Sequence, residues 1–254
     1  MRKWINGFAL LVTLLMNALA NFLRLGGNTT GEVAERYLNL YTPAGITFAI
    51  WGLIYLLMIV FVVRQWSDAF LRERVGWLFA ASCVLNTLWL LAWHFEWLGV
   101  SVLLIAALLW TLVRIELRLG GACRGAAART ISCIGFDIYC GWVIAASIGC
   151  IATWLTQIGW NGFGLPESVW TVIVLVLGAL IATAFVLQQD RPFVGAGVIW
   201  AYLGVLLRQL SPEGFAGRYP AVVVTAAAGI TAIAVTILAV LLAPYLPTPK
   251  RARS

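Results

Sequence analysis

Long apolar runs separated by short polar segments constrain this chain more than any other feature of its sequence. The stretch Tyr41–Val63 contains no charged residue, and a transmembrane helix needs about 20 consecutive apolar residues. Charged residues make up only 11% of the 254 residues, whereas about a quarter is usual in soluble domains. No polar segment is long enough to build a core of its own. We therefore predict an all-α polytopic membrane protein.

Eight apolar runs are predicted to be transmembrane helices, at about residues 4–23, 43–63, 76–93, 98–115, 131–157, 169–187, 193–207 and 221–242. The seventh is shorter than the usual ~17–25 residues. The first also resembles a signal peptide, with Ala18-Leu19-Ala20 as a cleavage site. Asn17 and Asn21, four residues apart on one helix face, favour a helix that is retained.

Positive charge predicts the orientation of these helices. With eight spans, 13 of the 17 Lys and Arg residues fall at the two ends of the chain and in the even-numbered loops. Cytoplasmic loops carry such an excess, so we predict both termini in the cytoplasm and a location in the inner cell membrane. Without the seventh span, the basic tail with Lys250, Arg251 and Arg253 would lie on the wrong side. The charges lie in short loops rather than on one folded polar face, so the lipid bilayer, not nucleic acid, is the expected partner.

One helical face of the second run carries aromatic side chains. Phe48, Trp51 and Tyr55 follow one another at i, i+3 and i+7. Such residues fill contacts between helices or form the wall of a pocket, and the two alternatives are open at this point. Similar spacing recurs in the third and fifth runs, at Asn86, Trp89, Trp93, Tyr139, Trp142 and Ala146.

The segment between the first two runs, Arg24–Tyr41, is long enough to cover a cavity. We call this segment the lid. Aromatic walls with a few polar groups such as Asn86 suit a flat, largely apolar ligand. The three aromatic faces and the lid together favour a pocket wall over simple helix packing.

Little else in the sequence indicates chemistry. Asp137 is the one acid expected within a span, where an ionisable residue is a functional candidate. The alternative places it at the membrane interface, near the first turn of its helix, where negative charge is favoured. No catalytic motif or acid–base pair supports an enzyme. The single histidine, His94, cannot form a histidine cluster, so no metal site is predicted.

The five cysteines are more typical of small buried hydrophobic residues than of disulfides or metal ligands. Their number is odd, and no two of them form a C-x-x-C pair. The five are Cys83, Cys123, Cys133, Cys140 and Cys150.

Three segments resemble the translocator protein/tryptophan-rich sensory protein (TspO/MBR) family. The segment TPAGITFAIWGLIYLLM matches the family motif at Pro43, Trp51, Tyr55 and Met58. VLNTLWLLAWHF resembles the family segment L-N-x-x-W, and IYCGWVIAA resembles Y-L-x-W-V-x-x-A. The chain departs from the family pattern at Thr42, Gly45 and Cys150, where the family has Pro, Trp and often Asn.

The resemblance covers about residues 1–160 and implies a TspO-like five-helix bundle, to which residues 161–254 add three transmembrane helices. It implies a pocket between helices 1, 2, 3 and 5 under the lid, for a hydrophobic ligand such as a porphyrin or haem precursor, with no cofactor required. Many family members are homodimers. Transport of a small hydrophobic molecule and photo-oxidative modification of a tetrapyrrole are the alternative functions.

Overall fold

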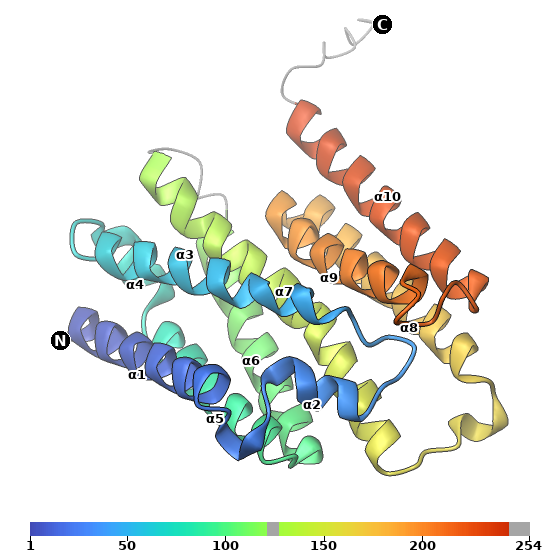
Figure 1. Ribbon diagram of the computed structural model, residues 1–254. Coiled ribbons are helices and arrows are strands. Elements are labelled where there is room, and N and C mark those ends of the chain that lie inside the picture. Colours follow the sequence, from blue (N-terminus) through green and yellow to red (C-terminus); the bar gives the residue numbers. More distant parts are fainter. Residues whose placement is uncertain (121–126, 244–254) are drawn as a thin grey trace, which may run out of the picture.

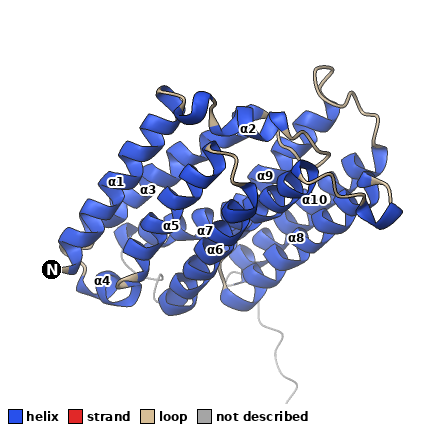
Figure 2. Cartoon of the chain, turned by 90° about the horizontal axis from the view of Figure 1, so that it is seen from below, coloured by secondary structure: helices blue, strands red, loops and turns tan. Residues whose placement is uncertain are grey.

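The computed structural model describes residues 1–120 and 127–243, and within them every regular element is a helix (Figures 1 and 2). The long helices are α1 (Arg2–Phe22), α3 (Ile50–Arg64), α5 (Leu78–His94), α6 (Leu98–Leu119), α7 (Ala127–Gln157), α8 (Glu167–Gln189), α9 (Pro192–Leu210) and α10 (Pro220–Leu242). Shorter helices are α2 (Thr30–Arg36), α4 (Ala69–Val75), η1 (Leu25–Gly27), η2 (Gly45–Ala49) and η4 (Gly162–Gly164).

Among the described residues, seven helices are long and apolar enough to cross a membrane. The number becomes eight if α4 and α5, which meet at a bend of 56°, form one span. The predicted all-α polytopic fold is therefore confirmed. The short seventh run belongs to α9, which has 19 residues, because Pro192 begins the helix earlier than expected and the apolar face continues to Leu210.

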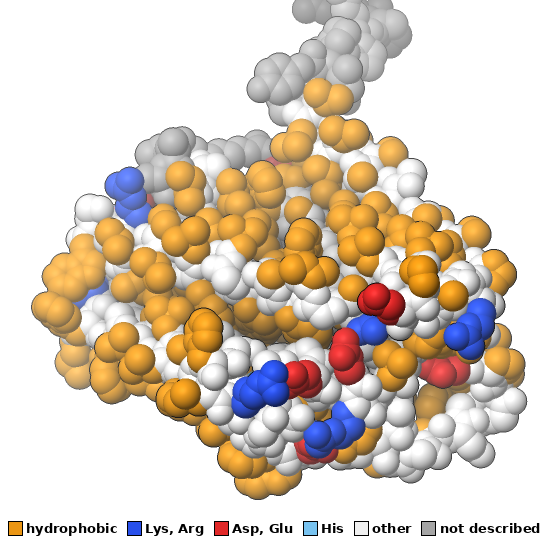
Figure 3. All heavy atoms as spheres, viewed as in Figure 1, with side chains coloured by type: hydrophobic (Ala, Val, Ile, Leu, Met, Phe, Trp, Pro, Cys, Tyr) orange, Lys and Arg blue, Asp and Glu red, His pale blue; other side chains and the backbone are white. Residues whose placement is uncertain are grey.

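Hydrophobic side chains cover much of the face shown in Figure 3, and charged side chains gather around its lower part. Leu53, Leu103 and Leu180 are examples of large apolar residues at the surface. Such a surface suits contact with lipid, because hydrocarbon does not penalise apolar exposure. The described part of the chain thus has the exterior of a multi-pass membrane protein.

The second span does not begin as the sequence suggested. We expected this span to begin at about residue 43, but η2 starts at Gly45 and α3 at Ile50. The backbone N–H of Ala44 donates to the carbonyl of Gly204 in α9 instead of starting a helix (2.9 Å). The tertiary contact replaces the local helical bond.

Helix α9 packs unusually close to α7. A Cβ atom built on Gly197 would lie 2.7 Å from the carbonyl oxygen of Ile138, and one on Gly141 would lie 2.0 Å from that of Val194. Only glycine permits such an approach of two helix backbones. The C-terminal helices are thereby joined directly to the N-terminal five, although a boundary near residue 160 stays a prediction.

Three cysteines, Cys83, Cys140 and Cys150, are free and buried, as predicted. Cys133 is disulfide-bonded, so the prediction was wrong for this residue, because spacing in the sequence does not show which thiols meet in the fold. Cys123 and the basic tail lie outside the described residues.

Candidate functional site: a cavity beneath the lid

A small cavity of about 50 Å³ lies beneath the lid. The lid and the adjoining segment supply Ala34, Asn39, Tyr41, Thr42, Pro43 and Phe48. The helices supply Trp89 and Trp93 from α5, Trp142, Ala145, Ala146, Gly149, Cys150 and Thr153 from α7, and Ala201 and Val205 from α9. The lining is mostly apolar and aromatic, which is the usual character of a small-molecule site.

An aromatic cluster adjoins the cavity, with Trp51 at its centre. The Trp51 ring stacks on Tyr55 at 5.5 Å and lies 5.6 Å from Trp89, between ring centroids. Tyr139 and Trp142 approach it edge-on, at 5.9 and 6.2 Å. All five are buried. Trp89 and Trp142 of this cluster also line the cavity, so the cluster packs behind its aromatic wall.

A chain of hydrogen bonds ties the tyrosines of this cluster together. Asn17 of α1 donates to the Tyr55 hydroxyl (3.1 Å), and that hydroxyl donates to Asn86 Oδ1 (3.1 Å). The Asn86 amide in turn donates to the Tyr139 hydroxyl (3.0 Å). Because these groups are buried, each bond spares a polar atom the cost of being unpaired in an apolar interior.

The predicted site residues thus divide into two groups. Those that line the cavity are Phe48, Trp89, Trp93, Trp142 and Ala146. Those that form the adjoining aromatic and hydrogen-bonded cluster are Trp51, Tyr55, Asn86 and Tyr139. Periodicity identified side chains that face the bundle interior, but it could not tell which of them would meet a partner and which would border a cavity.

The predicted set of walls needs one correction. We expected helices 1, 2, 3 and 5 to enclose the pocket, but no residue of α1 lines it, and α9 contributes Ala201 and Val205. Helix α1 instead supplies Asn17 to the hydrogen-bonded cluster. The sequence carried one signal for α9, its closely spaced Gly195 and Gly197, and the second of these lets α9 approach α7.

Two cavity-lining tryptophans have indole N–H groups without a hydrogen-bond partner among the described residues. They are Trp89 and Trp142, both 3% exposed, and Trp51 next to them shares this property. The Trp89 N–H lies near the Cys150 thiol but does not reach hydrogen-bonding geometry with it. Buried unpaired donors are rare, and each one calls for an explanation.

The lid is a structured segment with its own helix, which the sequence analysis missed. A capping box begins α2: Glu32 accepts from the Thr29 backbone N–H (2.8 Å), and Thr29 accepts from that of Glu32 (3.3 Å). The spacing Thr-x-x-Glu was the available signal. The bond from Thr29 lowers the pKa of Glu32.

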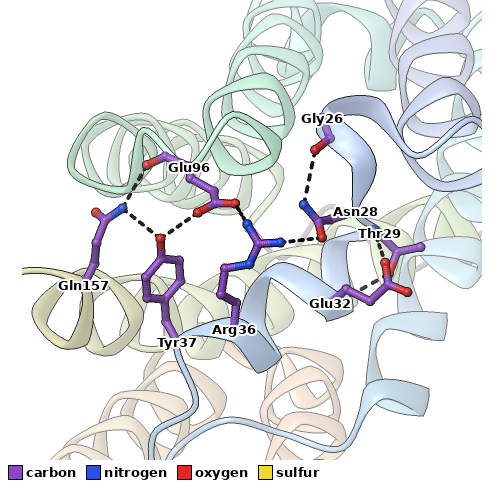
Figure 4. Close-up of polar contacts among 8 residues, drawn as sticks. All are labelled: Gly26, Asn28, Thr29, Glu32, Arg36, Tyr37, Glu96 and Gln157. Carbon is purple, nitrogen blue, oxygen red and sulfur yellow. Dashed lines mark hydrogen bonds and ion pairs between the residues drawn. The ribbon is translucent and has the colours of Figure 1, made fainter.

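Side-chain contacts hold the lid to the α5–α6 turn and to α7 (Figure 4). Glu96 lies between Arg36, with which it forms an ion pair, and Tyr37, whose hydroxyl donates to it (2.6 Å). Gln157 donates to the Glu96 carbonyl (3.1 Å). The bond to Glu96 raises the pKa of Tyr37 above its ordinary value.

The other half of the lid is attached to α8 and α9. Arg208 pairs with Glu35 (2.5 Å), and the Gln209 amide donates to the carbonyl of Leu40 (2.7 Å). The backbone N–H of Leu40 donates to Glu167 at the start of α8 (2.6 Å). The lid therefore bridges the two parts of the chain.

Asp137 does not line the cavity. It is ten positions beyond the start of α7 at Ala127 and only 3% exposed, so it does not lie near the first turn of its helix, and its depth in the membrane stays a prediction. The helix begins well before the apolar run, which carries Asp137 into the bundle. There it pairs with Arg191 (3.3 Å), which also pairs with Glu116 (3.4 Å).

The fold and the site define a class of protein: a polytopic helical bundle with an aromatic cavity beneath a lid. A family model described as TSPO-like protein matches residues 3–240. The chain therefore belongs to the TSPO-like protein family, and the match includes the three helices that the motif comparison left out. No curated protein and no solved structure matches it.

Proposed function

We propose that this protein binds a flat, largely apolar ligand that carries a hydrogen-bond acceptor, in the cavity beneath the lid. The unpaired indole N–H groups of the cavity-lining Trp89 and Trp142 carry this proposal. A carbonyl or carboxylate oxygen of a ligand would satisfy them, and the surrounding aromatic rings would stack on its flat face. Binding of this kind fits a sensory or translocator-like membrane protein.

The size of the cavity defines how a larger ligand could enter. A volume of about 50 Å³ compares with roughly 300–1,000 Å³ for sites that hold drug-sized molecules. A porphyrin therefore requires the lid to move away from α7 and α9. The ion pairs of the lid with Glu96 and Arg208 are partly solvent-exposed, and such pairs contribute only about 0–1 kcal/mol each. The buried bond between Gln209 and Leu40 must also break for the lid to open.

Titration of tryptophan fluorescence with protoporphyrin in detergent tests the proposal. We expect saturable quenching, and Trp142→Phe should weaken binding about fivefold, since one hydrogen bond contributes about 1 kcal/mol. Trp97→Phe is the matched control, because Trp97 is 62% exposed and does not line the cavity. Unsaturable quenching, or equal affinity in the two variants, would contradict the proposal.

The same titration with a smaller aromatic molecule that carries a hydrogen-bond acceptor, such as an indole carboxylate, tests the size of the ligand. If it saturates the site and the porphyrin does not, the ligand is of the smaller class and the lid need not open fully. The same Trp142→Phe variant should lower its affinity, because the contact with the indole N–H is shared by both ligands.

Transport is the alternative function, and the position of Asp137 bears on it. The acid pairs with Arg191 and does not line the cavity, so direct coupling of a ligand to this acid has no geometric support. Uptake of the bound ligand into vesicles, compared between wild type and Asp137→Asn, measures whether transport occurs and depends on it. Photo-oxidation of a bound tetrapyrrole would appear in the same samples as light-dependent loss of its absorbance.

A further inference from the structure

A second buried polar site lies in the bundle, apart from the cavity. Glu116 of α6, Asp137 of α7 and Arg191, which precedes α9, form what we call the buried ion triad. Their side chains are only 1%, 4% and 3% exposed. The cavity lining begins further along α7, at Trp142. The triad is therefore independent of the proposed function.

The charges of the triad do not balance if both acids are ionised. Among the described residues, Arg191 is the one cation within ion-pair distance of either carboxylate. Two carboxylates and one guanidinium carry a net negative charge, and an uncompensated charge in a low-dielectric interior is costly. Binding one proton makes the triad neutral.

The contacts indicate which acid holds the proton. Arg191 Nη1 makes a hydrogen bond with Asp137 Oδ1 (3.3 Å). Both carboxyl oxygens of Glu116 are buried and accept no hydrogen bond from any described residue. Arg191 Nε lies 3.4 Å from Glu116 Oε2, so both acids lie beside the same guanidinium. Two carboxyl groups can form a hydrogen bond only when one of them is protonated.

We infer that the buried ion triad is a proton-binding site, in which Glu116 is a neutral carboxylic acid that donates its proton to the Asp137 carboxylate beside Arg191. The proton is taken from water, and it forms an O–H bond on Glu116 without any other bond breaking in the protein. A shared proton between two acids is a property of the pair.

The other ionisable groups near the triad that the structure describes do not change this charge balance. Cys140 of α7 lies close enough to interact with all three members and is a buried thiol. On α6, Arg114 and Arg118 are exposed. Asp190, the neighbour of Arg191, is also exposed. The triad thus places one exchangeable proton where α6, α7 and the start of α9 meet.

Infrared spectroscopy of the full-length protein, in a detergent without ester groups, tests this inference. At neutral pH the wild type should show the carbonyl band of one protonated carboxylic acid, shifted in D₂O. Glu116→Gln should abolish the band, because it removes the acid that holds the proton. Asp137→Asn should also abolish it, because Glu116 then ionises against Arg191. Glu35→Gln is the control and should leave the band unchanged, since Glu35 is half exposed and paired.

The variant Arg191→Gln should strengthen the carbonyl band, whereas the two acid variants should remove it. Removal of the only cation of the triad should leave both acids protonated, so the band should double in intensity. The inference is overturned if the wild type shows no such band, or if the band survives in both Glu116→Gln and Asp137→Asn. Those two variants decide the matter even if Arg191→Gln does not fold.

Discussion

The lid contacts and the buried ion triad use the same chemistry in opposite environments. Arg36 and Glu96 on the lid side are 48% and 23% exposed, whereas Arg191 and Glu116 are 3% and 1% exposed. Water screens the first pair and competes with it, so the first pair can separate at low cost. The second pair has no water to replace its partners. Burial, rather than residue type, therefore decides which of the two ion pairs can separate easily.

Removal of the arginine from the buried ion triad should have the largest effect on stability of the changes considered. Arg191→Ala leaves two acids without a cation, and we expect a loss of about 3–5 kcal/mol in the free energy of unfolding at neutral pH. The loss should shrink as the pH falls, because protons from solution neutralise the acids. Thermal unfolding in detergent measures it. Arg24→Ala, at an exposed pair with Glu32, should change stability by less than about 1 kcal/mol, and equal losses in the two variants would contradict the comparison.

A side chain at Gly197 should be the next most damaging change, because α9 links the triad to the cavity. In Gly197→Ala the new Cβ would meet the α7 backbone at 2.7 Å, and we expect a loss of about 1–3 kcal/mol. Gly52→Ala is the matched control, since a Cβ there meets nothing within 4 Å. Unfolding by denaturant compares them, and an unchanged Gly197→Ala would show that the α7–α9 approach is looser than described.

Neutralisation of Glu96 should alter ligand entry more than stability. Glu96→Gln breaks the ion pair with Arg36, at a cost of at most about 1 kcal/mol. We expect faster association of protoporphyrin in stopped-flow fluorescence, with less dependence of the rate on salt. Glu213→Gln, at an exposed position outside the lid contacts, serves as the control. If both variants associate at the wild-type rate, the lid does not limit entry.

The smallest expected effect is on the titration of Tyr37. Its pKa is raised by the hydrogen bond to Glu96, so this bond stabilises the closed lid below the ordinary tyrosine pKa and is lost as the pH rises through the raised value. In Glu96→Gln the pKa of Tyr37 should move back toward its ordinary value. NMR of the tyrosine ring carbons follows this change. An identical titration in both proteins would show that the contact is absent in solution.

The predictions from sequence succeeded where a residue's role follows from its own helix. The spacing of Trp51 and Tyr55 placed these rings toward the bundle interior, because both lie on α3 and an α-helix repeats every 3.6 residues. The same argument found Asn86 and Tyr139, which meet in the structure (3.0 Å). It failed for Ala201 and Val205 of α9, because small residues give no periodic signal of a cavity wall.

The departure at Gly45 also became intelligible only in the structure. This position, which carries Trp in the family motif, lies next to the lid: a Cβ on Gly45 would be 3.9 Å from the Glu35 carboxylate. That carboxylate pairs with Arg208 of α9. A tryptophan side chain at this position would extend toward the space that this ion pair now occupies.

The sequence alone determined that this chain is a helical membrane protein with an aromatic interior. The length of its apolar runs, the helical spacing of its aromatic residues and the position of its charges are enough, because the bilayer requires long helices whatever their neighbours. The family motifs narrowed that class to TSPO-like proteins. Tertiary structure alone decided that α9 rather than α1 borders the cavity, that the lid bridges both parts of the chain, and that Asp137 and Glu116 both pair with Arg191. These are contacts between segments far apart in sequence, and no local pattern encodes which distant groups will share a buried space.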